Sequence, residues 1–318
     1  MIPLFEDLDL SSPGVVIALF DRAADASLTA HCRRGSIDVI SATEPGPARL
    51  IATGDIHDNT VALAKLATLA GMTATGMTAA GNPPTAHLTL HEIIHSDRLS
   101  NGMDFSYRAL ARAAVLKAAF PEHVHTLLAN HELAQVVGAG ITKDGINVVA
   151  AFNAGVEYIF GDETSAVTAA INRFIYAMPL ALRCTSSAAA LDVASGGDLL
   201  CAHSLPGPLA MDRFDVTLLE RATTDADFIP RQGSAHMLVW GRHQRPADLD
   251  LLAKRWGASL FILGHEKAPT GAMLLCDHAV ILNTDHDQAR YLDIDLTNPP
   301  TAAQAVERAQ LLADIELA

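Results

Sequence analysis

Short apolar runs and longer amphipathic stripes succeed one another along the chain. The short runs predict strands, at residues 15–20, 48–53, 86–94, 124–128, 199–202, 237–240, 259–263, 273–276, 280–282 and 291–296. Apolar side chains spaced three and four positions apart, or Ala-rich stretches, predict helices, over residues 60–70, 106–119, 151–180, 247–256 and 301–316. Pro and Gly residues predict a break at 44–47, and residues 71–84 predict a loop. Strands that alternate with helices and then follow one another in series predict a layered α/β core.

Side chains of the kinds that bind metals follow four of these apolar runs. They are Asp55 and His57 after 48–53, Asn130 and His131 after 124–128, His203 after 199–202, and His265 after 259–263. The carboxyl ends of strands in layered α/β folds converge on one crevice, so we expect these residues to meet there. In an extended backbone, Asp55 and His57 would share one face. The alternative is that each residue merely caps a helix or forms a turn.

A further group of polar residues, His91 to His95, spells HEIIH. On a helix, two histidines at this spacing bind zinc, and the glutamate serves as the base of a metallopeptidase. Pro83 and Pro84 stand upstream, and residues 85–90 alternate as a strand does. No third-histidine continuation follows, so the peptidase stays an alternative rather than the leading interpretation.

Composition narrows the class of protein. The 318 residues include 36 acidic and 22 basic side chains, which gives a net charge of −14 and argues against a dedicated nucleic-acid binder. The four cysteines form no CxxC pair, which argues against a disulfide framework and predicts a cytoplasmic location. No apolar run reaches the length of a membrane span, and the N-terminus is acidic, so we expect neither a membrane partner nor a secretory signal. No GK[ST] sequence supports a nucleotide P-loop.

Five blocks, taken in order, resemble a known family. They are GDIHD at 54–58, HEIIHSDR at 91–98, ANHE at 129–132, LLCAHSLPGP at 199–208 and LGHEKAPTG at 263–271. Their order and spacing resemble the calcineurin-like metallophosphoesterases, most closely the serine/threonine phosphoprotein phosphatases, over about residues 50–296. The resemblance implies an α/β fold, a four-layer α-β-β-α sandwich of two mixed β-sheets flanked by helices. It also implies a metallophosphoesterase domain over 49–298. The residues on either side predict an N-terminal extension over 1–48, packed on the core, and a C-terminal helix over 299–318.

The resemblance further implies a centre of two divalent metal ions (Mn, Fe or Zn). The implied ligands are Asp55 and His57 for the first ion, Asn130, His203 and His265 for the second, and Glu92 as the bridge. His131 would protonate the leaving group, with His95 or Asp97 orienting it, and Arg98 would clamp the phosphate. The chain departs from the family where His91-Glu92 replaces Gly-Asp, where the Asp97-Arg98 pair is displaced by two positions, and where Ala129 replaces a glycine.

The expected function is therefore a metal-dependent phosphoesterase. It would hydrolyse a phosphomonoester, in a small molecule or a phosphoprotein, with a hydroxide activated by both metals and no covalent intermediate. The alternatives are a zinc metallopeptidase that uses residues 91–95 and a non-catalytic, metal-bound module that binds phosphate. The sequence leaves the metal, the substrate and the oligomeric state open.

Overall fold

The structure, a computed structural model, describes residues 8–72, 83–143, 145–185 and 197–317. Most of the loop predicted over 71–84 lies outside these residues. Among the described residues, no helix has both the length and the apolar character needed to cross a bilayer.

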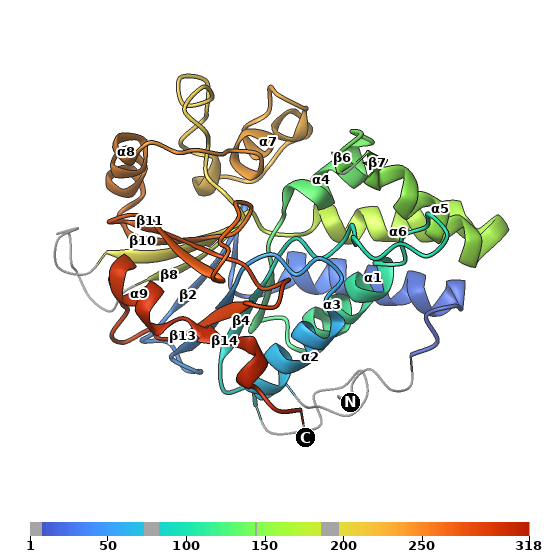
Figure 1. The fold of residues 1–318 in the computed structure, drawn as a ribbon, viewed down its shortest axis with the longest axis horizontal. Helices are drawn as coiled ribbons and strands as arrows, with labels where there is room; N and C mark the ends of the chain where they lie inside the picture. Colours follow the sequence, from blue (N-terminus) through green and yellow to red (C-terminus); the bar gives the residue numbers. More distant parts are fainter. Residues whose placement is uncertain (1–7, 73–82, 144, 186–196, 318) are drawn as a thin grey trace.

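Two mixed β-sheets form the centre of the fold (Figure 1). The seven-stranded sheet has the order β1 (Arg33–Arg34), β2 (Ile37–Ser41), β8 (Ala181–Thr185), β9 (Asp198–Ala202), β10 (Ala258–Leu263), β12 (Ala279–Leu282), β11 (Ala272–Cys276). The five-stranded sheet has the order β14 (Gln310–Leu311), β13 (Arg290–Asp295), β3 (Arg49–Thr53), β4 (His87–Leu90), β5 (Val124–Thr126). A separate hairpin joins β6 (Thr142–Lys143) to β7 (Ile146–Asn147). Both large sheets contain parallel and antiparallel pairs, such as β3 with β4 and β3 with β13.

The strands are apolar on both faces because each sheet is covered twice. On β9, Leu199 and Cys201 join the apolar cluster between the two sheets, whereas Leu200 and Ala202 join the cluster beneath the helices. Successive strand residues point to opposite faces, so this division follows from the period of two. It explains why the strand runs lack a regular alternation of apolar and polar residues.

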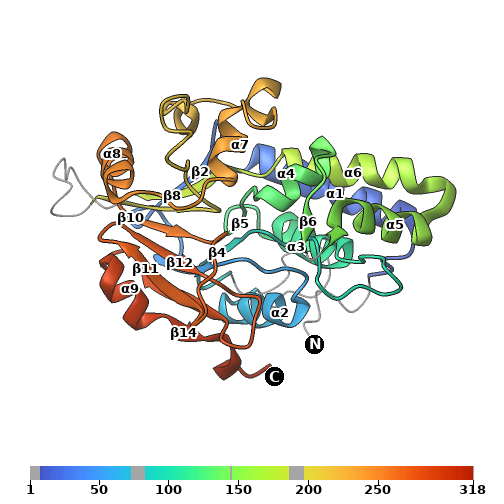
Figure 2. The ribbon, with the colours of Figure 1, turned by 45° about the horizontal axis from the view of Figure 1, so that its top comes forward.

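Helices flank the sheets (Figures 1 and 2). They are α1 (Pro13–Thr29), α2 (Thr60–Leu69), α3 (Tyr107–Ala119), α4 (Asn130–Val137), α5 (Val148–Phe160), α6 (Thr164–Tyr176), α7 (Ser234–Val239), α8 (Pro246–Trp256) and α9 (Ala302–Arg308). In both views α1, α3, α5 and α6 gather on one side, while α8 lies near β10 and α9 near β11 and β12. The sandwich of two mixed sheets flanked by helices confirms the fold class expected from the resemblance.

The strand predicted over 15–20 is wrong, because these residues lie inside α1. Val16, Leu19, Phe20 and Ala23 are buried at spacings of three, one and three, which is a helical stripe. Short apolar runs cannot distinguish a strand from a buried helix by periodicity alone. The helix packs against α3 and α6, so this part of the N-terminal segment adds a helix to the flanking layer.

Two further predictions are wrong near the C-terminal half. The apolar residues 237–240 were expected to form a strand, but 234–239 form α7, another short run that periodicity misassigns. The helix predicted over 301–316 ends at Arg308, and β14 then pairs with β13. The predicted helices 60–70, 106–119 and 247–256 are confirmed with small shifts at their ends.

Candidate metal centre

The polar residues at the strand ends come together at one edge of the sandwich. Asp55 follows β3 and forms isolated parallel β-bridges to His91, which follows β4, and to Asn283, which follows β12. Asn130 and His131 begin α4, His203 follows β9, and His265 follows β10. A cavity of about 610 Å³ opens there, lined in part by Asp55, His57, Glu92, Asn130, His131 and His265. His203 lies beneath it, fully buried.

Glu92 occupies the middle of this group. Its Oε1 lies 2.8 Å from His57 Nε2 and 3.7 Å from His131 Nε2. Its Oε2 lies 2.7 Å from His203 Nε2. The two oxygens of one carboxylate therefore face two different sets of nitrogen atoms, and the three-residue groups His57–Glu92–His131 and Glu92–His203–His265 share only Glu92.

The polar atoms around His203 are too crowded for hydrogen bonds alone to satisfy them. His203 Nε2 lies 2.6 Å from Asn130 Oδ1, 3.1 Å from His265 Nδ1 and 2.7 Å from Glu92 Oε2. One ring nitrogen carries at most one hydrogen and cannot donate to three acceptors. His265 Nε2 is buried without a hydrogen-bond partner among the described residues. Neutral imidazole, amide oxygen and carboxylate atoms in such a cluster suit a divalent cation such as Mn, Fe or Zn.

His91 fixes the ring state of His203. The Nε2–H of His91 donates to the carbonyl oxygen of Thr53 at 2.9 Å, which leaves His91 Nδ1 as an acceptor. His203 Nδ1 lies 3.1 Å from that atom and donates to it, so the other nitrogen of a neutral His203, Nε2, turns its lone pair toward Glu92 and Asn130. Histidine ligands of metals are commonly held in this way through their second nitrogen.

A second chain of hydrogen bonds stands behind His131. Gln135 donates through Nε2 to Asn153 Oδ1 at 2.7 Å, so Gln135 Oε1 accepts from His95 Nε2 at 3.1 Å. His95 Nδ1 then accepts from His131 Nδ1 at 3.0 Å. The nitrogen of His131 that faces the cavity is consequently Nε2.

Several of these residues have a left-handed backbone. The φ angles are 41° at His57, 48° at Glu92, 65° at His95 and 67° at His265. Side chains other than glycine adopt this region rarely, and such strain concentrates at functional sites. Asp55 and His57 were expected to share one face of an extended strand. They do not, because the backbone turns at His57.

Asp55 occupies a different position from the one expected. Its carboxylate accepts the backbone N–H of His265 at 2.9 Å, and its Oδ1 lies 3.5 Å from both His91 Nδ1 and His203 Nδ1. It lines the same cavity as His57, yet the nearest histidines are these two. Gly264 permits this arrangement, because a Cβ there would lie 2.2 Å from Asp55 Oδ1 and 2.5 Å from His91 Cε1.

Burial sets the charge of these groups. Burial, together with the nearby Glu92 carboxylate, raises the pKa of Asp55 to about 7. Burial opposes ionisation of Glu92 as well, but the surrounding histidines outweigh it and hold the pKa of Glu92 well below its usual value. Burial lowers the pKa of both His91 and His131 to about 3. For His203, burial lowers the pKa, but the carboxylates of Glu92 and Asp55 outweigh it and raise the pKa above its usual value.

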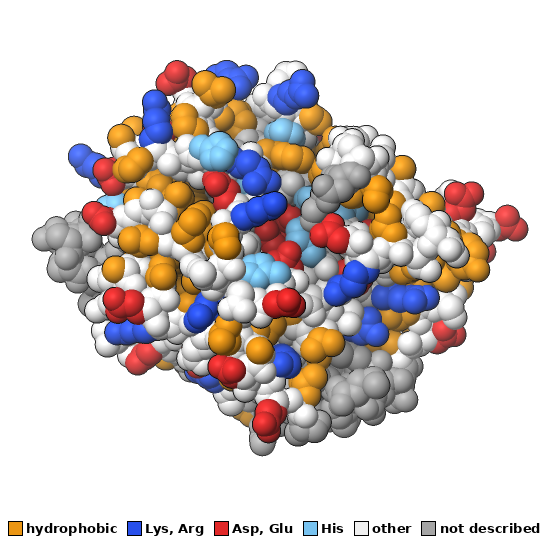
Figure 3. Space-filling view, in the orientation of Figure 1, with side chains coloured by type: hydrophobic (Ala, Val, Ile, Leu, Met, Phe, Trp, Pro, Cys, Tyr) orange, Lys and Arg blue, Asp and Glu red, His pale blue; other side chains and the backbone are white. Residues whose placement is uncertain are grey.

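Arg98 lies apart from the cavity wall. Its side chain is 64% exposed, and its Nη2 donates to the carbonyl oxygen of Asp58 at 2.6 Å. The cavity is lined instead by Arg242 and Lys267, and by Asp97. Figure 3 shows acidic and histidine side chains in a hollow near the centre of this face, with Lys and Arg side chains at its border.

The HEIIH residues do not form a helix. His91 is in a β-bridge, and residues 92–96 have no regular secondary structure. The two histidines therefore cannot lie one helical turn apart, and the zinc-peptidase interpretation fails on its structural requirement. Glu132 holds this segment, because its Oε1 accepts the backbone N–H groups of Ile93 and Ile94 at 2.7 and 3.1 Å.

No protein-family model matches the sequence, and no curated protein matches it. Among solved structures, the chain is similar to a protein serine/threonine phosphatase from Saccharomyces cerevisiae with similarity to human phosphatase PP5. The TM-score is 0.62 at 14% identity, over 89% of this chain and 82% of the other. It is also similar to a cold-active protein-tyrosine phosphatase of a psychrophilic Shewanella, with a TM-score of 0.50 at 10% identity, over 86% and 85% of the two chains. The chain therefore has a phosphoprotein phosphatase-like fold.

Three residues that lie at or behind the cavity were not predicted as site residues from the sequence. His91 was considered only as a peptidase ligand, although its replacement of a glycine was visible. Trp240 and Arg242 line the cavity but fall in and after a run mistaken for a strand. No signal in a single sequence distinguishes Arg242 from other surface arginines.

Proposed function

We propose that this protein is a metal-dependent phosphatase that hydrolyses phosphomonoesters at a centre of two divalent cations. The observation that carries the proposal is the position of Glu92, whose two oxygens face two separate donor sets. The phosphatase-like fold is consistent with it, and strand ends in layered α/β folds converge on one crevice, which is the kind of edge at which Glu92 lies.

The ligands would divide around Glu92. His57 and Glu92 Oε1 would hold one cation, and Asn130, His203, His265 and Glu92 Oε2 the other. Asp55, which lines the cavity beside them, would complete the first set after a rotation away from the His265 N–H. Two bound cations supply a water of lowered pKa and neutralise the phosphoryl oxygens.

The protein side chains would do the remaining work. Nε2 of His131 faces the cavity, while Nδ1–H is engaged by His95, so a proton on Nε2 makes the ring cationic. The negative charge of a bound phosphoester would favour this cationic form, which would protonate the leaving oxygen. Arg242 lines the cavity and offers a planar pair of N–H groups to the phosphoryl oxygens. Arg98, the arginine expected from the family pattern, instead holds the turn at Asp58.

Turnover of p-nitrophenyl phosphate with Mn²⁺ tests this function. Glu92→Gln removes the shared charge, and His131→Ala removes the proton donor, so each should lower kcat by a factor of about 10² to 10⁴. His278→Ala is a matched control, because His278 lies in the turn between β11 and β12 and does not line the cavity. Full activity in both site variants refutes the proposal. Bound metal without turnover of any phosphoester favours the non-catalytic module.

A further inference from the structure

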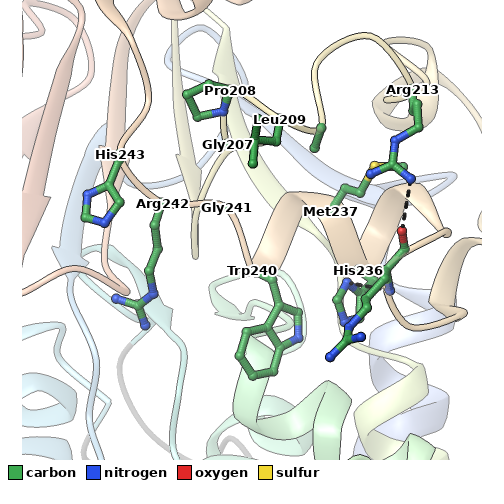
Figure 4. A pocket seen from close by; sticks show the side chains of 12 residues that line it. Gly207, Pro208, Leu209, Arg213, His236, Met237, Trp240, Gly241, Arg242 and His243 are labelled. Carbon is green, nitrogen blue, oxygen red and sulfur yellow. Dashed lines mark hydrogen bonds between the residues drawn. The ribbon is translucent and has the colours of Figure 1, made fainter.

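A second cavity, of about 470 Å³, adjoins the metal centre. It is formed by residues 207–210 on one side and by α7 and residues 240–243 on the other. Trp240 and Arg242 line both cavities, so the two spaces meet at these side chains. Figure 4 shows the Trp240 ring between Arg242 on one side and His236 on the other.

The second cavity is basic although the protein is acidic. Arg213, Arg231 and Arg242 line it, and none of its lining residues is an Asp or Glu. Among the described residues, no carboxylate forms an ion pair with these three arginines, while Arg183, Arg221 and others elsewhere are paired. In a chain with 36 acidic and 22 basic residues, three arginines without a carboxylate around one cavity indicate an anionic ligand.

Two of the three arginines donate hydrogen bonds to backbone carbonyl oxygens. Arg242 Nη1 donates to the carbonyl oxygen of His265 at 2.9 Å, which places its guanidinium beside a proposed metal ligand. Arg213 Nη1 lies 3.5 Å from the carbonyl oxygen of Arg231, the contact drawn in Figure 4. A neutral carbonyl leaves the positive charge of the guanidinium uncompensated, so each arginine can still bind an external anion.

The remaining walls are apolar and open to solvent. The Leu209 side chain is 94% exposed, and the Trp240 ring stacks on His236 at a centroid distance of 5.6 Å. Sites for small ligands enclose most of their ligand, whereas the arginines of this cavity lie at the surface. A shallow basic and apolar groove that leads to a reaction centre suits an extended peptide better than an enclosed small molecule.

We infer that this cavity binds acidic residues next to the phosphorylated residue of a peptide substrate. The inference rests on the proposed phosphatase function and adds to it a preference for phosphopeptides with acidic residues near the phosphate. Arg242, the proposed phosphate contact, lines both cavities and would therefore lie where this groove meets the metal centre. Arg213 and Arg231, which line only the second cavity, would contact residues further along the peptide.

The test compares two phosphopeptides that differ only in having Asp or Asn around the phosphorylated residue. The wild-type protein should process the Asp peptide with about tenfold higher kcat/KM, through a lower KM, and this preference should shrink at high salt. Arg213→Glu/Arg231→Glu should abolish or invert the preference and leave p-nitrophenyl phosphate turnover unchanged. Lys65→Glu is a matched charge-reversal control, because Lys65 contacts residues 312 and 313, away from the cavity.

Three outcomes overturn the inference. In the first, the wild type processes both peptides equally. In the second, the double variant keeps the preference for the Asp peptide. In the third, the wild type prefers adenosine monophosphate to both peptides and the double variant does not, which identifies a nucleotide site. Binding of fluorescent Asp and Asn peptides, followed by anisotropy, separates this inference from the proposed function. If p-nitrophenyl phosphate is not hydrolysed, the phosphatase proposal fails, while an Arg-dependent preference in binding still supports the groove.

Discussion

His95 Nδ1 lies 3.0 Å from Nδ1 of His131, the residue proposed to donate the proton. The His95 imidazole therefore stands behind His131, and Gln135 holds it in turn. This pair fixes the ring orientation of His131 without placing a negative charge behind it.

His95→Ala should lower kcat for p-nitrophenyl phosphate about 10- to 100-fold with little change in KM, because His131 loses its orienting acceptor. Metal content should stay unchanged, since His95 belongs to neither donor set. His95→Asn, whose amide oxygen can replace the acceptor, should recover part of the activity. Unchanged kcat in the alanine variant contradicts the positioning role.

His91→Phe should weaken metal binding. The substitution preserves a ring but removes the acceptor that keeps His203 Nδ1–H engaged, and losses of such supporting bonds typically cost about 10- to 100-fold in metal affinity. Titration of the protein with Mn²⁺ in a calorimeter measures the effect, and the phenylalanine variant should show one weakened site. Two unaltered sites contradict the assignment of His203 as a ligand oriented by His91.

Gly264→Ala should disturb the centre more than its size suggests. The new Cβ would lie 2.2 Å from Asp55 Oδ1, closer than any van der Waals contact, so Asp55 and His91 must move. We expect loss of metal binding and activity with a folded protein. Gly102→Ala is a control at an exposed glycine that has no neighbour within 4 Å; its positive φ adds backbone strain only locally. Normal metal content in Gly264→Ala contradicts the account.

Arg242→Ala and Arg98→Ala discriminate between two candidate phosphate contacts. Arg242 lines the cavity and Arg98 does not, so the first variant should raise KM for p-nitrophenyl phosphate about tenfold or more, whereas the second should have a small effect. Steady-state kinetics at fixed Mn²⁺ measures both. The reverse order would restore the phosphate-clamping role to Arg98.

The free energy of unfolding should depend on pH through His87, a residue that lies outside the metal centre. It is buried, its Nδ1 lies 3.2 Å from His125 Nε2, and burial together with neighbouring histidines lowers its pKa to about 3. The unfolded chain, with a histidine pKa near 6.5, takes up the proton first, so the stability from this group is complete above about pH 6.5 and falls as the pH decreases. Between pH 6.5 and 5 the loss should be about 2 kcal/mol.

Urea unfolding of the wild type and His87→Gln at pH 7.5, 6.5 and 5.0 measures this dependence. The variant should lose less stability on acidification than the wild type, whatever its stability at neutral pH. Equal slopes in the two proteins contradict the prediction.

The sequence predicted the fold where patterns were long or ordered. Five motif blocks in series indicated the two-sheet sandwich, and the stripes of α2, α3 and α8 were long enough to identify as helices. The runs 15–20 and 237–240 were misassigned because a handful of consecutive apolar residues suits a strand or a buried helix equally. Tertiary contacts with α3 and α6 determine the outcome for α1.

The convergence of the strand ends was predictable from the sequence, but the pairing of the side chains there was not. Strand ends indicated that Asp55, Asn130, His203 and His265 would converge, because topology gathers them. Asp55 lies beside His91 and His203, and the chain then makes a left-handed turn at His57; no residue type in that segment predicts either feature. The roles of His91 and His95 depend on which ring nitrogen meets which acceptor, and that requires coordinates.

The most direct test is a crystal structure of the Mn²⁺-loaded protein with anomalous scattering data. The account predicts two peaks about 3.5 to 4 Å apart, on either side of the Glu92 carboxylate. One peak should lie near His57, and the other near Asn130, His203 and His265. A single peak, or peaks away from Glu92, would contradict the proposed two-metal centre.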